Sequence, residues 1–226
     1  MQRSEDRAFP PVVMGRGAIP SASPGPTAEI VLRAGDGVAV LVNPAASTRE
    51  GRTTDAQSAL RRLTGDERIV INRRPSGRPA LCPPFPELGV SLSHRDGALL
   101  AAFSPTVRVG TDIEPDDATL DARTLAADHF TPREAHAVAA LSAAGARELF
   151  LRLWVAKEAA LKLTGRGIHD GLHWPDLSAQ SATLMTGDAA AEVAGDVPYA
   201  AAVAIVVRRL ERPGSPALYC ALAVER

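Results

Sequence analysis

The sequence predicts an α+β fold made of two similar lobes. The chain has 226 residues, enough for two lobes of about 110 residues each. Hydrophobic residues make up 46% of it, so each lobe can bury a core. The expected elements form two successive blocks, each with a strand, helical segments and further strands. The boundary between the blocks lies near residue 105. We therefore expect a mobile, proline-rich tail over residues 1–27, an N-terminal lobe over residues 28–106 and a C-terminal lobe over residues 107–226.

Composition argues against several classes of protein. The net charge is −1, from 25 basic and 26 acidic side chains, which disfavours a protein that mainly coats nucleic acid. The longest apolar run, residues 199–207, has the length of a strand rather than of a membrane span. The first 26 residues contain five prolines and no apolar stretch of the kind a signal peptide needs. We expect a cytoplasmic protein with neither a nucleic-acid nor a membrane partner.

The elements of the N-terminal lobe follow from apolar runs and turn residues. A helix should begin at Thr54 or Asp55 and end near Leu63, because Thr64-Gly65 is a helix-stop signal. Asp96-Gly97 is a hairpin turn signal, so the segments on either side of it should pair. The expected strands are residues 38–42, 68–71, 89–94 and 98–103, with a proline-rich loop over residues 73–87.

The C-terminal lobe should begin with a strand over residues 107–113, where side chains alternate between two faces. Gly110, Asp112 and Glu114 fall on one face, so the two carboxylates should project together. The remaining expected elements are helices over residues 120–128, 132–143 and 147–164 and strands near residues 182–186, 199–207 and 217–224.

The carboxylate pair is the first candidate for chemistry. Asp112 and Glu114, beside a glycine that permits close approach, have the ligand chemistry for a hard cation such as magnesium. The alternative is a solvated strand face, or a turn carboxylate before Pro115.

A charged trio on the longest expected helix is the second candidate. Glu158 and Lys162 are four residues apart and share a face, and Lys157 lies about 100° round the helix, close enough to flank the same cleft. The alternative is a surface ion pair that contributes about 0.2–0.5 kcal/mol.

Residues near the expected hairpin form the third candidate. Ser93 and His94 end a strand, where they could bind a phosphate or cap the turn. Arginines that could bind phosphate precede them, with ordinary surface arginines as the alternative. These arginines are Arg52, Arg73, Arg74 and Arg78.

Together the three segments resemble the 4′-phosphopantetheinyl transferases of the two-lobed Sfp type. The motifs are Ser91-Leu-Ser93-His94, Gly110-Thr-Asp112-Ile-Glu114, and Trp154-Val-Ala-Lys157-Glu158-Ala-Ala-Leu-Lys162 with its extension to Gly167. The resemblance covers residues 38 to 224 and is strongest over residues 77 to 168. It implies a pseudo-twofold pair of α/β lobes with the active site in the cleft between them.

The resemblance also implies an activity. Enzymes of this family transfer the 4′-phosphopantetheine group of coenzyme A to a serine of an apo acyl or peptidyl carrier protein and release 3′,5′-ADP. Mg²⁺ assists, with Mn²⁺ as a possible substitute. The partners would be coenzyme A and a carrier protein, and the two fused lobes could close the site as a monomer.

Residue roles carry over at the matching positions. The metal ligands would be Asp112, Glu114 and Glu158; the coenzyme A contacts would be Arg52, Arg78, Ser93, His94, Lys157 and Lys162. Lys162 would supply positive charge to the leaving group. Glu158, a water held by the metal, or Glu134 would accept the serine proton. For Glu134 the alternative is a capping box with Thr131 at the start of a helix. Arg95 differs from the small residue that many relatives carry after the histidine.

Two other functions remain open at this level. One is a non-catalytic module of the same fold that binds coenzyme A or a carrier protein. The other is a magnesium-dependent hydrolase of phosphate esters built on the same acidic cluster.

Overall fold

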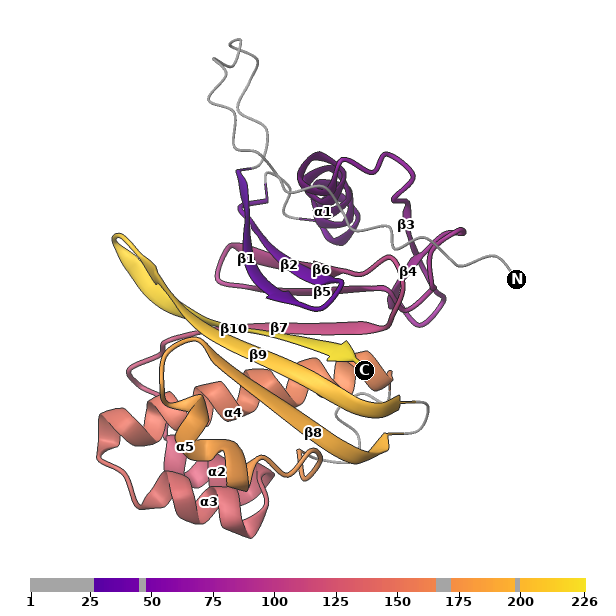
Figure 1. Ribbon diagram of the computed structural model, residues 1–226. Coiled ribbons are helices and arrows are strands. Elements are labelled where there is room, and N and C mark those ends of the chain that lie inside the picture. Colours follow the sequence, from indigo (N-terminus) through magenta and orange to yellow (C-terminus); the bar gives the residue numbers. More distant parts are fainter. Residues whose placement is uncertain (1–26, 45–47, 166–171, 198–199) are drawn as a thin grey trace.

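Two four-stranded antiparallel sheets form the centre of the structure (Figure 1). The structure, a computed structural model, describes residues 27–44, 48–165, 172–197 and 200–226. The first sheet has the strand order β1-β2-β6-β5 and the second the order β7-β10-β9-β8. Strands of the first sheet are β1 (Ala28–Ala34), β2 (Gly37–Val42), β5 (Val90–Arg95) and β6 (Ala98–Phe103). Strands of the second are β7 (Val109–Pro115), β8 (Ala189–Val197), β9 (Ala200–Arg212) and β10 (Ser215–Glu225).

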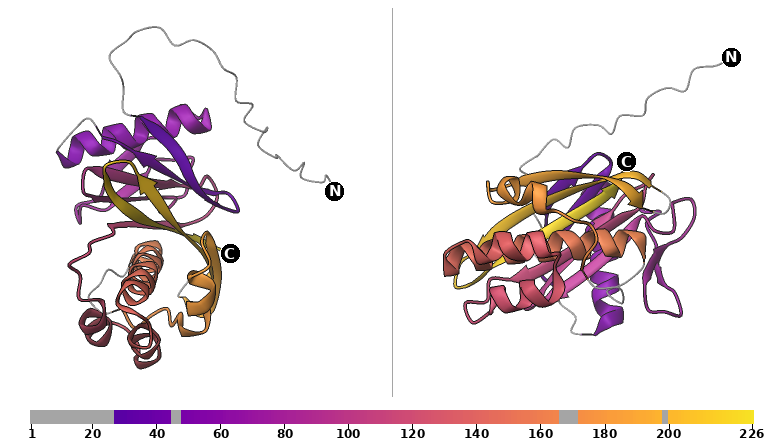
Figure 2. Two further views of the ribbon diagram at one scale, coloured as in Figure 1. Left: turned by 90° about the vertical axis from the view of Figure 1, so that its left-hand side faces the viewer. Right: turned by 90° about the horizontal axis from the view of Figure 1, so that it is seen from below.

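Helices cover the outer face of each sheet (Figures 1 and 2). Helix α1 (Arg49–Thr64) packs on the first sheet, and the long helix α4 (Ala143–Thr164) packs on the second. Short elements complete the described chain: the ribbon of β3 (Ile71–Arg73) and β4 (Pro79–Leu81), the helices α2 (Ala122–His129), α3 (Pro132–Ala139) and α5 (Ser181–Leu184), and the 3-10 turn η2 (Ser178–Gln180).

The structure has four layers: α1, the first sheet, the second sheet and α4 (Figure 1). They stack in this way because side chains alternate between the two faces of each strand, so that each sheet contributes to a core on both sides. In β2, Val40 joins the core beneath α1, whereas its neighbour Leu41 joins a core shared with the second sheet. In β10, Cys220 faces that shared core, whereas Ala221 lies in the core against α4. Both faces of β2, β6 and most of β10 are buried, which explains why these strands read as continuous apolar runs.

The edge strands of the two sheets lie side by side. The amide of Thr111 in β7 donates to Ser91 Oγ in β5 at 3.1 Å, and further side-chain contacts join the two strands toward their ends. Alternate residues of β5 therefore face β7. This seam brings the segment of residues 91–95 next to the carboxylates of β7.

Much of the expected secondary structure is confirmed. The Asp96-Gly97 turn joins β5 to β6, and both residues have positive φ (47° and 72°), as the tight hairpin requires. Gly65 ends α1 and Gly165 ends α4, each in the left-handed conformation. Val109 and Ile113 lie in the core between the sheets, so the expected division of faces in this strand is correct.

Other expectations are wrong. Residues 181–184 are helical rather than a strand, because a short apolar run does not distinguish the two and here Leu184 packs under the second sheet. Helix α1 begins at Arg49 rather than near Thr54, because Thr48 caps it by accepting a bond from the Gly51 amide.

Strand boundaries also differ from the sequence expectation. Residues 79–81, assigned to a loop, pair with residues 71–73, whereas residues 68–70 lie outside any strand. Strands β1 and β8 were not predicted.

The expected mixed α and β architecture is confirmed, while the pseudo-twofold relation between its halves stays a prediction. All strands of the first sheet precede Ser104 and all strands of the second follow Arg108, which is compatible with the proposed lobe boundary. The expected tail lies, except for residue 27, outside the described residues. In the part of the chain that is described, no helix combines the length and apolar character needed to cross a membrane.

Candidate active site

A glycine in β7 lets helix α4 approach the sheet closely. A Cβ atom on Gly110 would lie 1.9 Å from the carbonyl oxygen of Ala159 and 2.5 Å from the amide nitrogen of Leu163, so a larger residue could not fit without displacing the helix. This contact sets α4 directly against the strand that carries Asp112. The turn of helix around Ala159 also carries Glu158 and Lys162.

Asp112, Ser93 and Lys162 meet at the seam between the two sheets. Lys162 Nζ lies 2.6 Å from Asp112 Oδ1 and donates to Ser93 Oγ at 3.0 Å, while Ser93 Oγ donates to the same Asp112 oxygen at 2.8 Å. Asp112 is buried, whereas the side chain of Lys162 is 32% exposed. Residues from β5, β7 and α4 thus form one polar cluster, as the sequence predicted for these three side chains.

Glu158 places a second buried carboxylate beside Asp112. The pKa of Glu158 is raised to about 7, mainly by burial and also by the charge of Asp112, while Lys162 opposes the shift. One oxygen of each, Asp112 Oδ2 and Glu158 Oε1, is buried without a hydrogen-bond partner in the described structure. Two unpartnered carboxylate oxygens that repel one another fit a cation.

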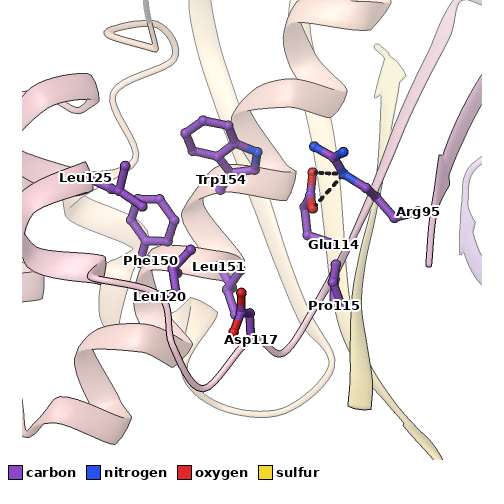
Figure 3. A pocket seen from close by; sticks show the side chains of 9 residues that line it. All are labelled: Arg95, Glu114, Pro115, Asp117, Leu120, Leu125, Phe150, Leu151 and Trp154. Carbon is purple, nitrogen blue, oxygen red and sulfur yellow. Dashed lines mark hydrogen bonds and ion pairs between the residues drawn. The ribbon is translucent and has the colours of Figure 1, made fainter. Parts of the chain in front are cut away.

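Glu114 lies at the mouth of this cluster and pairs with Arg95 (Figure 3). Arg95 Nε donates to both carboxylate oxygens of Glu114 at 3.0 Å. Burial raises the pKa of Glu114, and the neighbouring Asp112 adds to the rise. The pair lies at one end of a cavity of about 200 Å³ whose apolar wall includes Phe150 and Trp154.

The oxygen ligands of the three carboxylates have the right chemistry for a divalent cation, but their present positions do not form a binding site. Among the described residues, no three His, Cys, Asp or Glu side chains are positioned to hold a metal ion as they stand. Lys162 is bonded to Asp112 and Arg95 to Glu114, so basic side chains hold oxygens that a cation would need. The donor set fits a hard cation once these contacts rearrange.

A cationic pocket opens on the other side of Ser93. It has a volume of about 400 Å³, and its wall includes four of the residues expected to contact coenzyme A: Arg52, Arg78, Ser93 and His94. Burial lowers the pKa of His94, and the positive charges of Arg52 and Arg95 lower it further. The concentration of like charge makes this pocket suitable for an anionic ligand.

Arg78 links this pocket to helix α4. Its guanidinium donates to the carbonyl oxygen of Lys162 in the last turn of the helix, and it lies against Gly165, where a Cβ would clash with it. A cation at a helix C-terminus is favourably placed. Burial lowers the pKa of Arg78, and Arg74 and Arg108 add to the effect. An arginine has five N–H donors, so the contact with the helix leaves donors for a phosphate.

Lys157 does not lie in this site, contrary to the sequence expectation. The side chain is fully buried, with Nζ 2.8 Å from Glu134 Oε1 and a further bond to the carbonyl of Pro175. Nζ also lies 5.5 Å from the centre of the Phe130 ring. The rotation of about 100° from Glu158 turns Lys157 away from the seam and toward Phe130 and Pro175, where it is buried.

Glu134 is likewise engaged elsewhere, which corrects its expected role as a base. Its Oε2 accepts bonds from the amide and hydroxyl of Thr131, completing the capping box, and Oε1 accepts from the amide of Leu177 at 2.7 Å. With the Lys157 contact, the carboxylate is fully satisfied and fully buried. The structural alternative considered for this residue is therefore the correct one.

Sequence reasoning missed one arginine of the cationic pocket. Arg49 lines it beside Arg52 and Arg73. The spacing of three residues between Arg49 and Arg52 puts them on one face of α1, but the expected later start of the helix concealed this signal. Arg166 and Gly167, the end of the extended motif, lie outside the described residues.

Comparison with known proteins supports the family resemblance. Residues 108–200 match the family model described as the 4′-phosphopantetheinyl transferase superfamily. The resemblance to these transferases is confirmed. The chain is also 38% identical over 125 residues to the 4′-phosphopantetheinyl transferase HetI of Nostoc sp.. That alignment covers 52% of this chain and 53% of HetI, so the chain spans about half the length of this relative.

The superfamily segment divides the site residues into two groups. Residues 108–200 include the three carboxylates and Lys162, together with the buried pair of Glu134 and Lys157. The residues that line the cationic pocket precede the segment. Assignment to the Sfp type, which depends on the whole chain, stays a prediction.

Proposed function

We propose that this protein transfers the 4′-phosphopantetheine group of coenzyme A to a serine of an apo acyl or peptidyl carrier protein and releases 3′,5′-ADP. One observation carries most of the weight: Asp112, Glu158 and Lys162 form a buried cluster directly beside a cationic pocket. Phosphoryl transfer needs both parts, because it joins a highly anionic donor to a nucleophile that must lose a proton.

The acidic cluster would hold the divalent cation. Asp112, Glu114 and Glu158 are the proposed ligands, and the two unpartnered oxygens of Asp112 and Glu158 support this assignment. A bound Mg²⁺, or Mn²⁺ in its place, would neutralise charge on the diphosphate oxygens of coenzyme A. Arg52, Arg78 and His94 line the adjacent pocket, which suits the remaining phosphate.

The proposed transfer forms one bond to phosphorus and breaks another. The serine Oγ attacks the phosphorus that carries pantetheine, forming the new O–P bond. The bond from this phosphorus to the bridging oxygen breaks, and its electron pair leaves with 3′,5′-ADP. Lys162 Nζ, held by Asp112 and Ser93, is placed to donate a hydrogen bond to the oxygen that gains charge.

Glu158 is the proposed acceptor of the serine proton. Its carboxylate belongs to the same cluster as Asp112 and Lys162, next to the pocket proposed for coenzyme A. Glu134 has no free oxygen for this step. We propose further that the protein acts as a monomer in the cytoplasm, with coenzyme A and a carrier protein as its partners.

The test is transfer to a carrier measured by intact mass. The full-length protein is incubated with coenzyme A, MgCl₂ and a panel of apo carrier proteins, and a gain of one phosphopantetheine group is expected on at least one. Chelator, Glu158→Gln and a carrier whose acceptor serine is alanine should each remove the gain. Glu192→Gln, an exposed carboxylate on β8, is the matched control and should keep it.

Failure would separate the alternatives. Absence of transfer with coenzyme A still bound would overturn the proposal and favour a non-catalytic binding module. Release of phosphate from simple esters, without a carrier, would favour a hydrolase.

A further inference from the structure

The Arg95–Glu114 pair carries an inference about how a cation reaches the acidic cluster. Arg95 is the last residue of β5, and its side chain is 60% exposed, whereas that of Glu114 is 17% exposed. Both oxygens of Glu114 are engaged at 3.0 Å by the same nitrogen, so the carboxylate is turned toward the guanidinium (Figure 3).

The fold aims Arg95 at this carboxylate. Ser91, Ser93 and Arg95 alternate along one face of β5 and contact Thr111, Asp112 and Glu114 of β7 in turn. The tight turn that follows is anchored from the second sheet, because Arg212 Nη2 donates to Asp96 Oδ2 at 2.9 Å. Arg95 is therefore placed by the strand seam and its anchored hairpin.

Electrostatics gives this arginine a role in the cluster. Burial raises the pKa values of Glu114 and Glu158, and repulsion from the neighbouring carboxylate of Asp112 adds to both shifts. The bond to Glu114 raises the pKa of Arg95, and the charges of Asp112 and Glu158 raise it further. Arg95 thus sits in the field of all three proposed metal ligands.

We propose that Arg95 is the resident counter-ion of Glu114 and that a divalent cation must displace its guanidinium in order to bind this carboxylate. The inference rests on the metal site of the proposed function. Binding of the cation then breaks the Arg95–Glu114 pair, so Arg95 weakens metal binding to the free protein. The displaced guanidinium stays at the mouth of the cavity, where it is available to an anionic ligand that arrives with the metal.

The experiment measures Mn²⁺ binding to the metal-free, full-length protein by electron paramagnetic resonance, without any turnover. Arg95→Gln should tighten the Mn²⁺ dissociation constant by about two- to fivefold, the range typical for loss of one exposed competing ion pair. Arg33→Gln is the matched control. Arg33 is an exposed arginine on β1, so this change removes the same charge without altering the hairpin or the contact with Glu114.

The outcomes are distinct. Tightening by Arg95→Gln alone supports the inference. Equal tightening by Arg33→Gln would mean that only overall charge matters, and an unchanged constant in Arg95→Gln would mean that there is no competition; either result overturns the inference. Mn²⁺ binding that Glu158→Gln does not weaken would place the metal elsewhere, and this would overturn the proposed metal site and the inference with it.

Discussion

At the scale of single residues, the main feature of the site is that the carboxylates of Asp112 and Glu158 are buried away from water. Among the described residues, Asp112 and Glu158 each keep one buried oxygen without a hydrogen-bond partner, and Lys162 lies 2.6 Å from the other oxygen of Asp112. A buried charge that lacks compensation is costly, so Glu158 takes up a proton more readily than it would in water. For Glu158 this raises the pKa from 4.5 to about 7.

Glu158→Gln should change the pH dependence of stability. Because the pKa is about 7 in the folded protein and 4.5 as a reference, the unfolded chain binds fewer protons between these values, and the free energy of unfolding falls as pH rises. In chelator, the variant should gain stability relative to wild type between about pH 5 and about pH 8. Urea denaturation of both proteins measures the difference, and a difference that does not vary with pH would contradict the assignment.

Lys162→Met should remove most of the activity while preserving the fold. The side chain is about one-third exposed and its aliphatic stem is kept in the variant, but the hydrogen bond proposed to reach the leaving group is lost. Removal of one such donor costs about 10²–10³-fold in kcat. The carrier mass assay measures it, with Arg208→Met, a remote exposed cation paired with Asp188, as control. Full turnover by Lys162→Met would exclude its proposed role.

At the scale of elements, helix α4 presents different chemistry on its two faces. Glu158 and Lys162 face β7, where Gly110 allows close contact. Lys157 instead enters the core between α4, Phe130 and the segment around Pro175, where Glu134 meets it. The buried pair joins α3 to α4 and positions the helix on which the site depends.

Lys157→Met should therefore act on stability rather than on chemistry. It leaves the Glu134 carboxylate buried without its cation, a change that typically costs about 3–5 kcal/mol. The double variant Lys157→Met/Glu134→Gln should recover much of this loss, because no buried charge remains. Chemical denaturation measures the stabilities, and turnover per folded molecule should stay near that of wild type. A stable but inactive Lys157→Met protein would show that Lys157 contacts substrate.

At the scale of the whole molecule, the proposed site draws its two halves from different sheets. The cationic pocket is built on α1, the β3–β4 ribbon and β5, and the carboxylates lie on β7 and α4. They meet because the edge strands β5 and β7 lie side by side and the sheets share a core. A ligand with phosphates at both ends of a nucleotide could thus bridge the two halves.

Arg52→Ala should distinguish coenzyme A from dephospho-coenzyme A. If Arg52 contacts the 3′-phosphate, loss of one charge-assisted hydrogen bond should weaken coenzyme A binding by about tenfold and leave the dephosphorylated ligand nearly unaffected. Isothermal titration calorimetry measures both. Arg33→Ala, an exposed arginine on β1, should change neither constant. Equal losses for both ligands would contradict a contact with this phosphate.

The sequence by itself determined what depends on neighbours along the chain. Alternation placed Asp112 and Glu114 on one strand face, helical spacing put Glu158 beside Lys162, and Asp96-Gly97 marked the hairpin. These patterns follow from the fixed geometry of strands, helices and turns, and together with the motif resemblance they sufficed to assemble most of the candidate site.

The tertiary structure decided what depends on partners far apart in the sequence. Lys157 could have faced the cleft or the core, and its pairing with Glu134 settled the choice. Residues 181–184 became helical, and Arg95 became the partner of Glu114, through contacts between separate elements. The physical reason is that burial and pairing of charges are properties of the packed molecule, whereas periodicity is a property of the local chain.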